Sequence, residues 1–152
     1  MVQSTIVVVG ATGDLGGRIA KALIGRSSEV RALVRHNTAS EKLASLRSLG
    51  ATVVEADLSS VAEIKKATAG AACVVSTLSG LRDVIVDVQT ALLEGALEAG
   101  VPHFIPSDFC ISFTKMAPGQ GRRMKFCSGC IGPALAKSQA FSMCWPFQAK
   151  PR

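Results

Sequence analysis

Short apolar runs alternate with amphipathic segments through the first hundred residues of this chain. The apolar runs are rich in β-branched residues and have the length of strands that are covered on both faces. They predict five strands, at residues 5–9, 29–34, 52–56, 72–78 and 101–105. Continuous runs of this kind are typical of parallel sheets, because helices cover such sheets on both sides.

The segments between these strands have apolar residues at helical spacing and predict four helices. The helices cover residues 14–25, 40–49, 60–69 and 82–99. Strands that alternate with helices predict right-handed βαβ units. We therefore predict an α/β fold with a doubly wound parallel sheet of the Rossmann type, in the strand order 3-2-1-4-5.

Charge divides the chain into two unequal parts. Residues 1–114 carry ten Lys or Arg and eleven Asp or Glu, whereas the rest of the chain carries seven basic residues and no acidic one. Four of the five cysteines lie at or beyond Cys110, and residues 117–133 are rich in glycine, proline and basic residues. These shifts predict a Rossmann domain at residues 1–113 and an atypical, loop-rich basic tail at residues 114–152.

Several partners are not expected from this composition. No apolar stretch approaches the roughly 18 residues that cross a bilayer, and no secretory signal is visible, so we expect a cytoplasmic protein with no membrane partner. The basic residues of the tail are scattered and belong to no recognition helix, so we expect no nucleic-acid partner. Cys127 and Cys130 have the spacing of metal ligands, but no second pair accompanies them, and no metal site is predicted.

Three glycines, Gly10, Gly13 and Gly16, follow the first strand and open the first helix. They could form only a compact turn, in which Gly10 turns the chain and Gly16 lets the helix lie close to the strand. They could also expose the N–H groups at the helix start, where the positive end of the helix dipole favours a pyrophosphate. We favour the second interpretation, because the stretch lies beside the point where the strand order reverses. The chain lacks the Gly-Lys-Ser/Thr sequence of an ATP-binding loop.

Two charged residues affect how a dinucleotide would bind. Asp14 would repel a phosphate, or it could cap the first helix and point away. Arg35 directly follows the second strand, where an acidic residue would suit the ribose of NAD and an arginine suits the 2′-phosphate of NADP. No acidic residue follows before Glu41, so we predict NADP(H) in preference to NAD(H). The alternative is that Arg35 is an ordinary solvated side chain.

The ends of the other strands reach the same edge of the predicted sheet. Asp57 and Leu58 would lie near the adenine, although Asp57 could equally cap the following helix. Ser107, after the fifth strand, could contact the cofactor or form a turn. The residues that follow the fourth strand and would flank the ribose are Ser76, Thr77 and Leu78.

Four segments occur in order at suitable intervals: VVVGATGDLGGRIAKAL, VRALVRH, GATVVEADLSS and AGVPHFIPSDF. Together they make residues 5 to about 120 resemble the NmrA-like and isoflavone-reductase-like family of atypical short-chain dehydrogenases. The resemblance implies that Gly10, Thr12, Gly13 and Gly16 hold a pyrophosphate and that Arg35 binds the 2′-phosphate. It also implies that the turn containing Pro106 and Ser107 lies near the nicotinamide. The candidate cofactor-binding residues of the first loop are thus Gly10, Thr12, Gly13, Asp14, Leu15 and Gly16.

Reductases of this family use a lysine downstream of that turn for proton transfer. Lys115, Lys125 and Lys137 are available, but no motif distinguishes one of them, so the catalytic residues are unassigned. The chain has no tyrosine, which excludes the Tyr-x-x-x-Lys proton donor of ordinary short-chain dehydrogenases. Full-length members of the family continue with later strands and a substrate-binding domain, so we expect a truncated or alternative C-terminus.

Two functions are consistent with this sequence. The first is an NADPH-dependent oxidoreductase that transfers hydride to a small organic substrate, with the protein supplying orientation and electrostatics. The second is a non-catalytic NADP(H)-binding module or a redox-sensing regulator. In either case an unfinished sheet edge would favour a homodimer.

Overall fold

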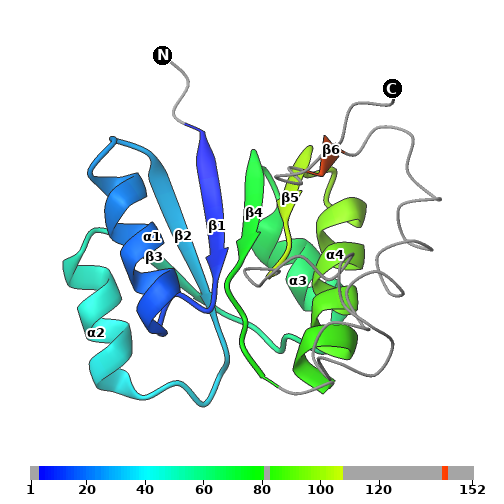
Figure 1. Ribbon diagram of the computed structural model, residues 1–152, viewed down its shortest axis with the longest axis horizontal. Coiled ribbons are helices and arrows are strands. Elements are labelled where there is room, and N and C mark those ends of the chain that lie inside the picture. Colours follow the sequence, from blue (N-terminus) through cyan, green and yellow to red (C-terminus); the bar gives the residue numbers. More distant parts are fainter. Residues whose placement is uncertain (1–3, 81–82, 108–141, 144–152) are drawn as a thin grey trace, which may run out of the picture.

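The computed structural model describes residues 4–80, 83–107 and 142–143. One sheet runs through this part of the chain, with helices on both of its faces (Figure 1). The strands are β1 (Thr5–Val9), β2 (Glu29–Val34), β3 (Thr52–Glu55), β4 (Cys73–Ser76), β5 (His103–Ile105) and β6 (Ser142–Met143). The helices are α1 (Asp14–Ile24), α2 (Ser40–Ser48), α3 (Val61–Thr68), the π-helix η1 (Asp83–Val88) and α4 (Gln89–Glu98).

The described strands pair in parallel, in the order β3-β2-β1-β4-β5-β6. The predicted order of the first five strands is confirmed. The structure adds β6, a two-residue strand within the segment predicted to be an irregular tail; the remainder of that segment lies outside the described residues. β1 has β2 on one side and β4 on the other, with Val9 opposite both Leu33 and Ser76. The strand order therefore reverses at β1 and β4, which is where ligands bind in open α/β sheets.

Alternate residues of β1 face two separate apolar layers. Val7 and Val9 pack in a cluster with residues of α3 and α4, whereas Val8 packs in a cluster with residues of α1 and α2. All three side chains are fully buried. The prediction of a strand covered on both faces is therefore confirmed.

The fourth predicted helix is not a continuous α-helix. It begins as η1, and regular α-helical geometry starts at Gln89. π-helical turns are rare and occur frequently at functional sites. α4 then packs closely on α3, since a Cβ on Gly95 would lie only 2.5 Å from Cγ2 of Ile64.

α3 is anchored to the sheet by an arginine on β2. A terminal guanidinium nitrogen of Arg31 donates hydrogen bonds to the carbonyl oxygens of Ala67 and Ala69, at 2.7 and 3.0 Å. A cation at the C-terminus of a helix stabilises it by satisfying carbonyl groups that have no partner within the helix. Because the helix is fixed at this end, its N-terminus is held at the opposite edge of the sheet, where β2 and β3 end.

Candidate dinucleotide-binding site

The packing of the protein itself requires glycine at two positions of the turn between β1 and α1. Gly10 has a φ of +84°, which residues with a side chain rarely adopt, and its carbonyl accepts a hydrogen bond from the N–H of Gly13 at 3.0 Å. A Cβ on Gly16 would overlap with the Gly10 carbonyl and lie 2.5 Å from Oγ1 of Thr77. Thr77 is itself fixed, because its hydroxyl donates to the Val9 carbonyl at 2.7 Å. The turn-forming and packing roles considered for Gly10 and Gly16 are confirmed.

Gly13 differs from these two glycines because the described residues leave the space around it open. It is exposed and occupies the N-cap of α1, and the only described atom that a Cβ there would meet is the Gly10 carbonyl oxygen, at an ordinary 3.4 Å. Among the described residues, no side chain caps this helix. The N–H groups of the first turn of a helix have no acceptor within it, and the helix dipole is positive at this end. This helix start therefore has the properties of an anion-binding site.

Asp14 does not cap α1, so that alternative is wrong. Gly13 holds the N-cap position, and Asp14 is the first residue within the helix. Its Oδ1 accepts a hydrogen bond from Nε of Arg18, one turn later, at 3.0 Å. Both side chains are largely exposed, at 76% for Arg18 and 80% for Asp14, so the pair adds little stability. Its effect is to place a positive charge beside the carboxylate that would otherwise oppose a phosphate.

Arg35 begins the turn that follows β2. Its carbonyl accepts hydrogen bonds from the N–H and the hydroxyl of Thr38, at 3.0 and 2.7 Å, so the backbone of this turn is ordered. Its side chain is exposed, and no described residue forms an ion pair or hydrogen bond with the guanidinium. Val9 lies opposite Leu33, so Arg35 leaves the sheet beside the glycine turn. The arginine is therefore positioned beside the helix start, and the N–H groups of its guanidinium are available to a ligand.

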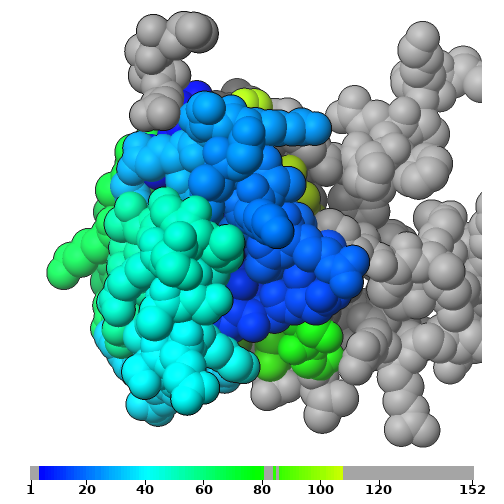
Figure 2. Space-filling model, turned by 90° about the vertical axis from the view of Figure 1, so that its left-hand side faces the viewer, coloured from blue at the N-terminus to red at the C-terminus, as the bar shows by residue number. Residues whose placement is uncertain are grey.

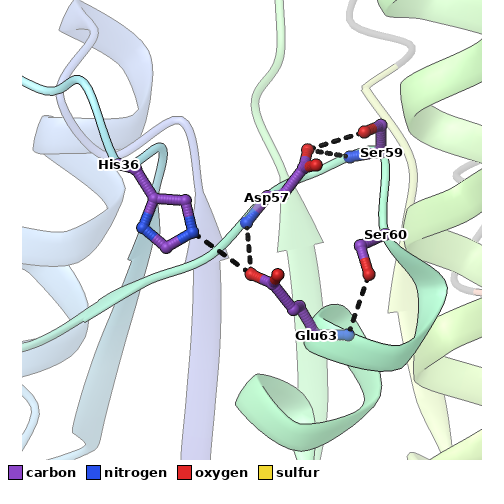
Figure 3. A network of polar contacts seen from close by, with 5 residues as sticks. All are labelled: His36, Asp57, Ser59, Ser60 and Glu63. Atoms are coloured by element: carbon purple, nitrogen blue, oxygen red, sulfur yellow. Dashed lines mark hydrogen bonds and ion pairs between the residues drawn. The ribbon is translucent and has the colours of Figure 1, made fainter.

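A polar network joins the ends of β2 and β3 (Figure 3). Nε2 of His36 lies 3.2 Å from Oε2 of Glu63, and the same oxygen accepts a hydrogen bond from the N–H of Asp57 at 2.8 Å. The hydroxyl of Ser60 caps α3 by accepting from the N–H of Glu63. Asp57 instead accepts from the N–H and the hydroxyl of Ser59, at 2.8 and 2.6 Å. The alternative in which Asp57 caps this helix is therefore wrong, because it forms the turn before the cap.

Hydrogen bonds lower the pKa of both carboxyl groups in this network. For Glu63 the largest cause is the N–H of Asp57, followed by the side chain of His36. For Asp57 the largest cause of the lowered pKa is the hydroxyl of Ser59, followed by the backbone N–H of Ser59. A carboxyl group with a lowered pKa stabilises the fold above its ordinary pKa, and this contribution is lost as the pH falls through the folded-state value.

The variant Glu63→Gln should therefore be less stable than the wild type at neutral pH but not in acid. We expect the difference in Tm to be largest near pH 7 and to shrink below the ordinary glutamate pKa of 4.5, as the wild-type carboxylate becomes protonated. Thermal unfolding followed by circular dichroism from about pH 7 to about pH 3 measures this difference. Glu94→Gln, at an exposed position of α4, is the matched control. A Tm difference for Glu63→Gln that does not change with pH would contradict the role of the carboxylate.

The ends of β4 and β5 are joined by Gln89, a residue that was not predicted from the sequence. The hydroxyl of Ser76 and the N–H of Ser107 both donate to Oε1 of Gln89, at 2.9 and 2.8 Å. The hydroxyl of Ser107 also donates to the carbonyl of Leu78. One signal was available, since Gln89 is a polar residue within the buried stripe of its helix, which continues through Leu92, Leu93 and Ala96.

The other predicted residues lie at the same edge in different environments. Leu58 is 6% exposed and packs in the apolar cluster of α3 and α4, and Pro106 is also buried. Thr12 is half-buried, whereas Leu15 is 43% exposed at the start of α1. Figure 2 shows the blue segment at the start of α1 next to the green segment that follows β4. The structure thus brings the predicted residues to one edge, and their contacts with a cofactor stay predictions.

Some candidates cannot be placed in this site. Cys127 and Cys130, the three lysines considered for proton transfer, and residues 108–109 lie outside the described part of the chain. Within that part, no group of three or more His, Cys, Asp or Glu side chains could hold a metal ion. None of the helices in the same residues has the length and apolar character needed to cross a membrane.

The strand order, the glycine turn and the open helix start define a protein of the Rossmann class. The model of the NmrA-like family matches residues 2–119, and the chain belongs to that family. A bifunctional pinoresinol-lariciresinol reductase of Linum usitatissimum is 34% identical over 122 residues, which make up 76% of this chain and 39% of the relative. Pinoresinol reductase 1 of Arabidopsis thaliana is 35% identical over 115 residues, or 70% of this chain and 36% of the relative. The chain thus spans well under half the length of these curated relatives.

Solved structures show the same similarity in three dimensions. A structure of AtPrR2 with NADP+ and (+)pinoresinol is 29% identical, with a TM-score of 0.77 over 90% of this chain and 47% of that one. The NADPH-dependent quinone oxidoreductase QOR2 of Escherichia coli, complexed with NADPH, is 26% identical, with a TM-score of 0.58 over 66% of this chain and 35% of that one.

Proposed function

We propose that this chain binds NADP(H) across the carboxyl edge of its sheet. The observation that carries the proposal is the exposed start of α1 at Gly13, which no described side chain caps, with the exposed guanidinium of Arg35 directly after the adjoining strand β2. The helix start would hold the pyrophosphate, and Arg35 would bind the 2′-phosphate. The similar structures that hold NADP+ and NADPH support this choice of cofactor.

We further propose that the chain takes part in a reduction in which NADPH donates a hydride to a small organic molecule. The support is the reductase activity named for the relatives that match most of this chain. When bound, the nicotinamide would supply the hydride, and the chain would orient it and limit access by water. Pinoresinol is the first acceptor to test, since it appears in the names of these relatives.

Because the chain spans only 36–39% of those relatives, binding and turnover need separate measurements. Calorimetric titration with NADP+, NADPH and NAD+ tests binding, and we expect both NADP forms to bind more tightly than NAD+. The absorbance of NADPH in the presence of pinoresinol and other small acceptors then tests turnover. Binding without oxidation across the panel would support the alternative function, a non-catalytic NADP(H)-binding module. If calorimetry detects no heat of binding with any of the three nucleotides, both the oxidoreductase and the NADP(H)-binding module are excluded.

A further inference from the structure

A buried amide connects the two strand ends that lie on the far side of β1 from Arg35. The side chain of Gln89 is 4% exposed, and its Oε1 accepts both the hydroxyl of Ser76 and the N–H of Ser107. A carbonyl oxygen has two lone pairs, so a single atom satisfies a donor from the end of β4 and a donor from the end of β5. The hydroxyl of Ser107 adds a third link, to the carbonyl of Leu78.

The position of this link in the sheet suggests what it is for. The start of α1 lies at the middle of the sheet, with β2 on one side and β4 and β5 on the other. A dinucleotide whose pyrophosphate sits at that helix start extends over both sides, one nucleotide on each. If Arg35 binds the 2′-phosphate of the adenosine half, the nicotinamide half must lie over the ends of β4 and β5, which Gln89 holds together.

We propose that Gln89 is a positioning residue for the nicotinamide half of NADP(H), an inference that rests on the proposed function. It fixes the segments after β4 and β5 relative to each other, so that the surface facing the nicotinamide is already formed before the cofactor arrives. The π-helix η1 ends at Val88, immediately before Gln89, and so sets where this side chain enters the core. Gln89 acts through Ser76 and Ser107, and it need not touch the cofactor.

The proposal depends on the chemistry of one oxygen atom, which gives a matched pair of variants. Gln89→Met keeps the length of the side chain but removes the acceptor, so the two donors lose their shared partner. Gln89→Glu keeps an acceptor at the same place, since a carboxylate accepts hydrogen bonds and both partners are donors. We expect the glutamate variant to behave like the wild type, and the methionine variant to bind NADPH about tenfold more weakly.

The second probe is adenosine 2′,5′-bisphosphate, which carries the 2′-phosphate and lacks the nicotinamide. We expect the wild type, Gln89→Met and Gln89→Glu to bind it equally, because it occupies only the adenosine half of the site, where Arg35 lies. This probe also reports that the methionine variant is folded. Calorimetric titration of the wild-type chain and of each variant with NADPH and with the bisphosphate gives the two affinities and their ratio.

Each outcome has a definite meaning. Weaker binding of NADPH to Gln89→Met alone, with rescue by Gln89→Glu, supports the proposal. Equal losses for the two probes would show that Gln89 is merely structural, and unchanged NADPH affinity would also overturn the proposal. A wild type that binds neither probe would instead overturn the proposed function.

A milder variant covers the case in which Gln89→Met does not fold. Ser76→Ala removes one of the two donors and leaves the bond from Ser107 to Gln89 in place. We expect this variant to bind NADPH roughly threefold more weakly than the wild type and to bind the bisphosphate with unchanged affinity. Wild-type affinity for NADPH in this variant would count against the proposal.

Discussion

Replacing Gly13 with valine should abolish the binding of both NADP(H) and NAD(H) while leaving the fold intact. The backbone of Gly13 is extended, with φ −89° and ψ 170°, which residues with a side chain adopt readily, and a Cβ would meet no described atom closer than 3.4 Å. The same side chain would project where a pyrophosphate must approach the helix N–H groups. We expect the affinity for either dinucleotide to fall at least about a hundredfold, measured by calorimetry.

Two further variants separate the effect on the ligand from the effect on the fold. Valine is a poor N-cap, so Gly13→Val should cost about 1 kcal/mol of stability, visible as a small decrease in Tm. Gly16→Ala should cost about 1–3 kcal/mol, because its Cβ would overlap with the Gly10 carbonyl and crowd Thr77. Gly13→Ala should weaken binding less than valine does. If Gly13→Val binds NADP(H) as the wild type does, no pyrophosphate occupies this helix start.

Replacing Arg35 with alanine should remove the preference of the protein for NADP(H) over NAD(H). The guanidinium is exposed at the end of β2, beside the helix start. A hydrogen bond to a charged group contributes about 1.5–3 kcal/mol, so NADP+ should bind roughly 10- to 150-fold more weakly. NAD+ lacks the 2′-phosphate, and its affinity should not change. Titration of wild type and variant with both nucleotides gives the comparison.

Salt and a second arginine provide the controls for this prediction. The advantage of the wild type over Arg35→Ala should shrink as ionic strength rises, because exposed charges are screened. Arg47→Ala removes another exposed arginine, in the last turn of α2, and should leave both affinities unchanged. Equal losses for NADP+ and NAD+ in Arg35→Ala would show that the arginine does not recognise the phosphate.

The sheet and the glycine turn could be predicted because their signals are local. Each of the five predicted strands is short and mainly apolar, and the order of these strands follows from the handedness of βαβ units. The glycines and Arg35 lie directly after such runs, so their place at one edge follows from the topology. Nothing in these predictions required knowledge of which side chains meet.

Features that depend on contacts between residues distant in the sequence were not predicted, or were predicted only as alternatives. Gln89 has its role only because Ser76 and Ser107, 13 and 18 residues away, end beside it in the folded sheet. In DLSSVAE, Asp57 and Ser60 are both suitable caps. A serine followed three residues later by glutamate was the sequence signal that favoured Ser60. The π-helical turn of η1 has no comparable local signal, because helical spacing alone does not distinguish it from an α-helix.

The close packing of Thr77 against the glycine turn has a consequence for folding during synthesis. Oγ1 of Thr77 fills the space beside Gly10 and Gly16, although it follows them by more than sixty residues. A nascent chain emerging from the ribosome would therefore carry the whole glycine sequence long before the loop could take its final shape. Competence to hold a nucleotide should appear only when β4 has been synthesised and has docked against β1.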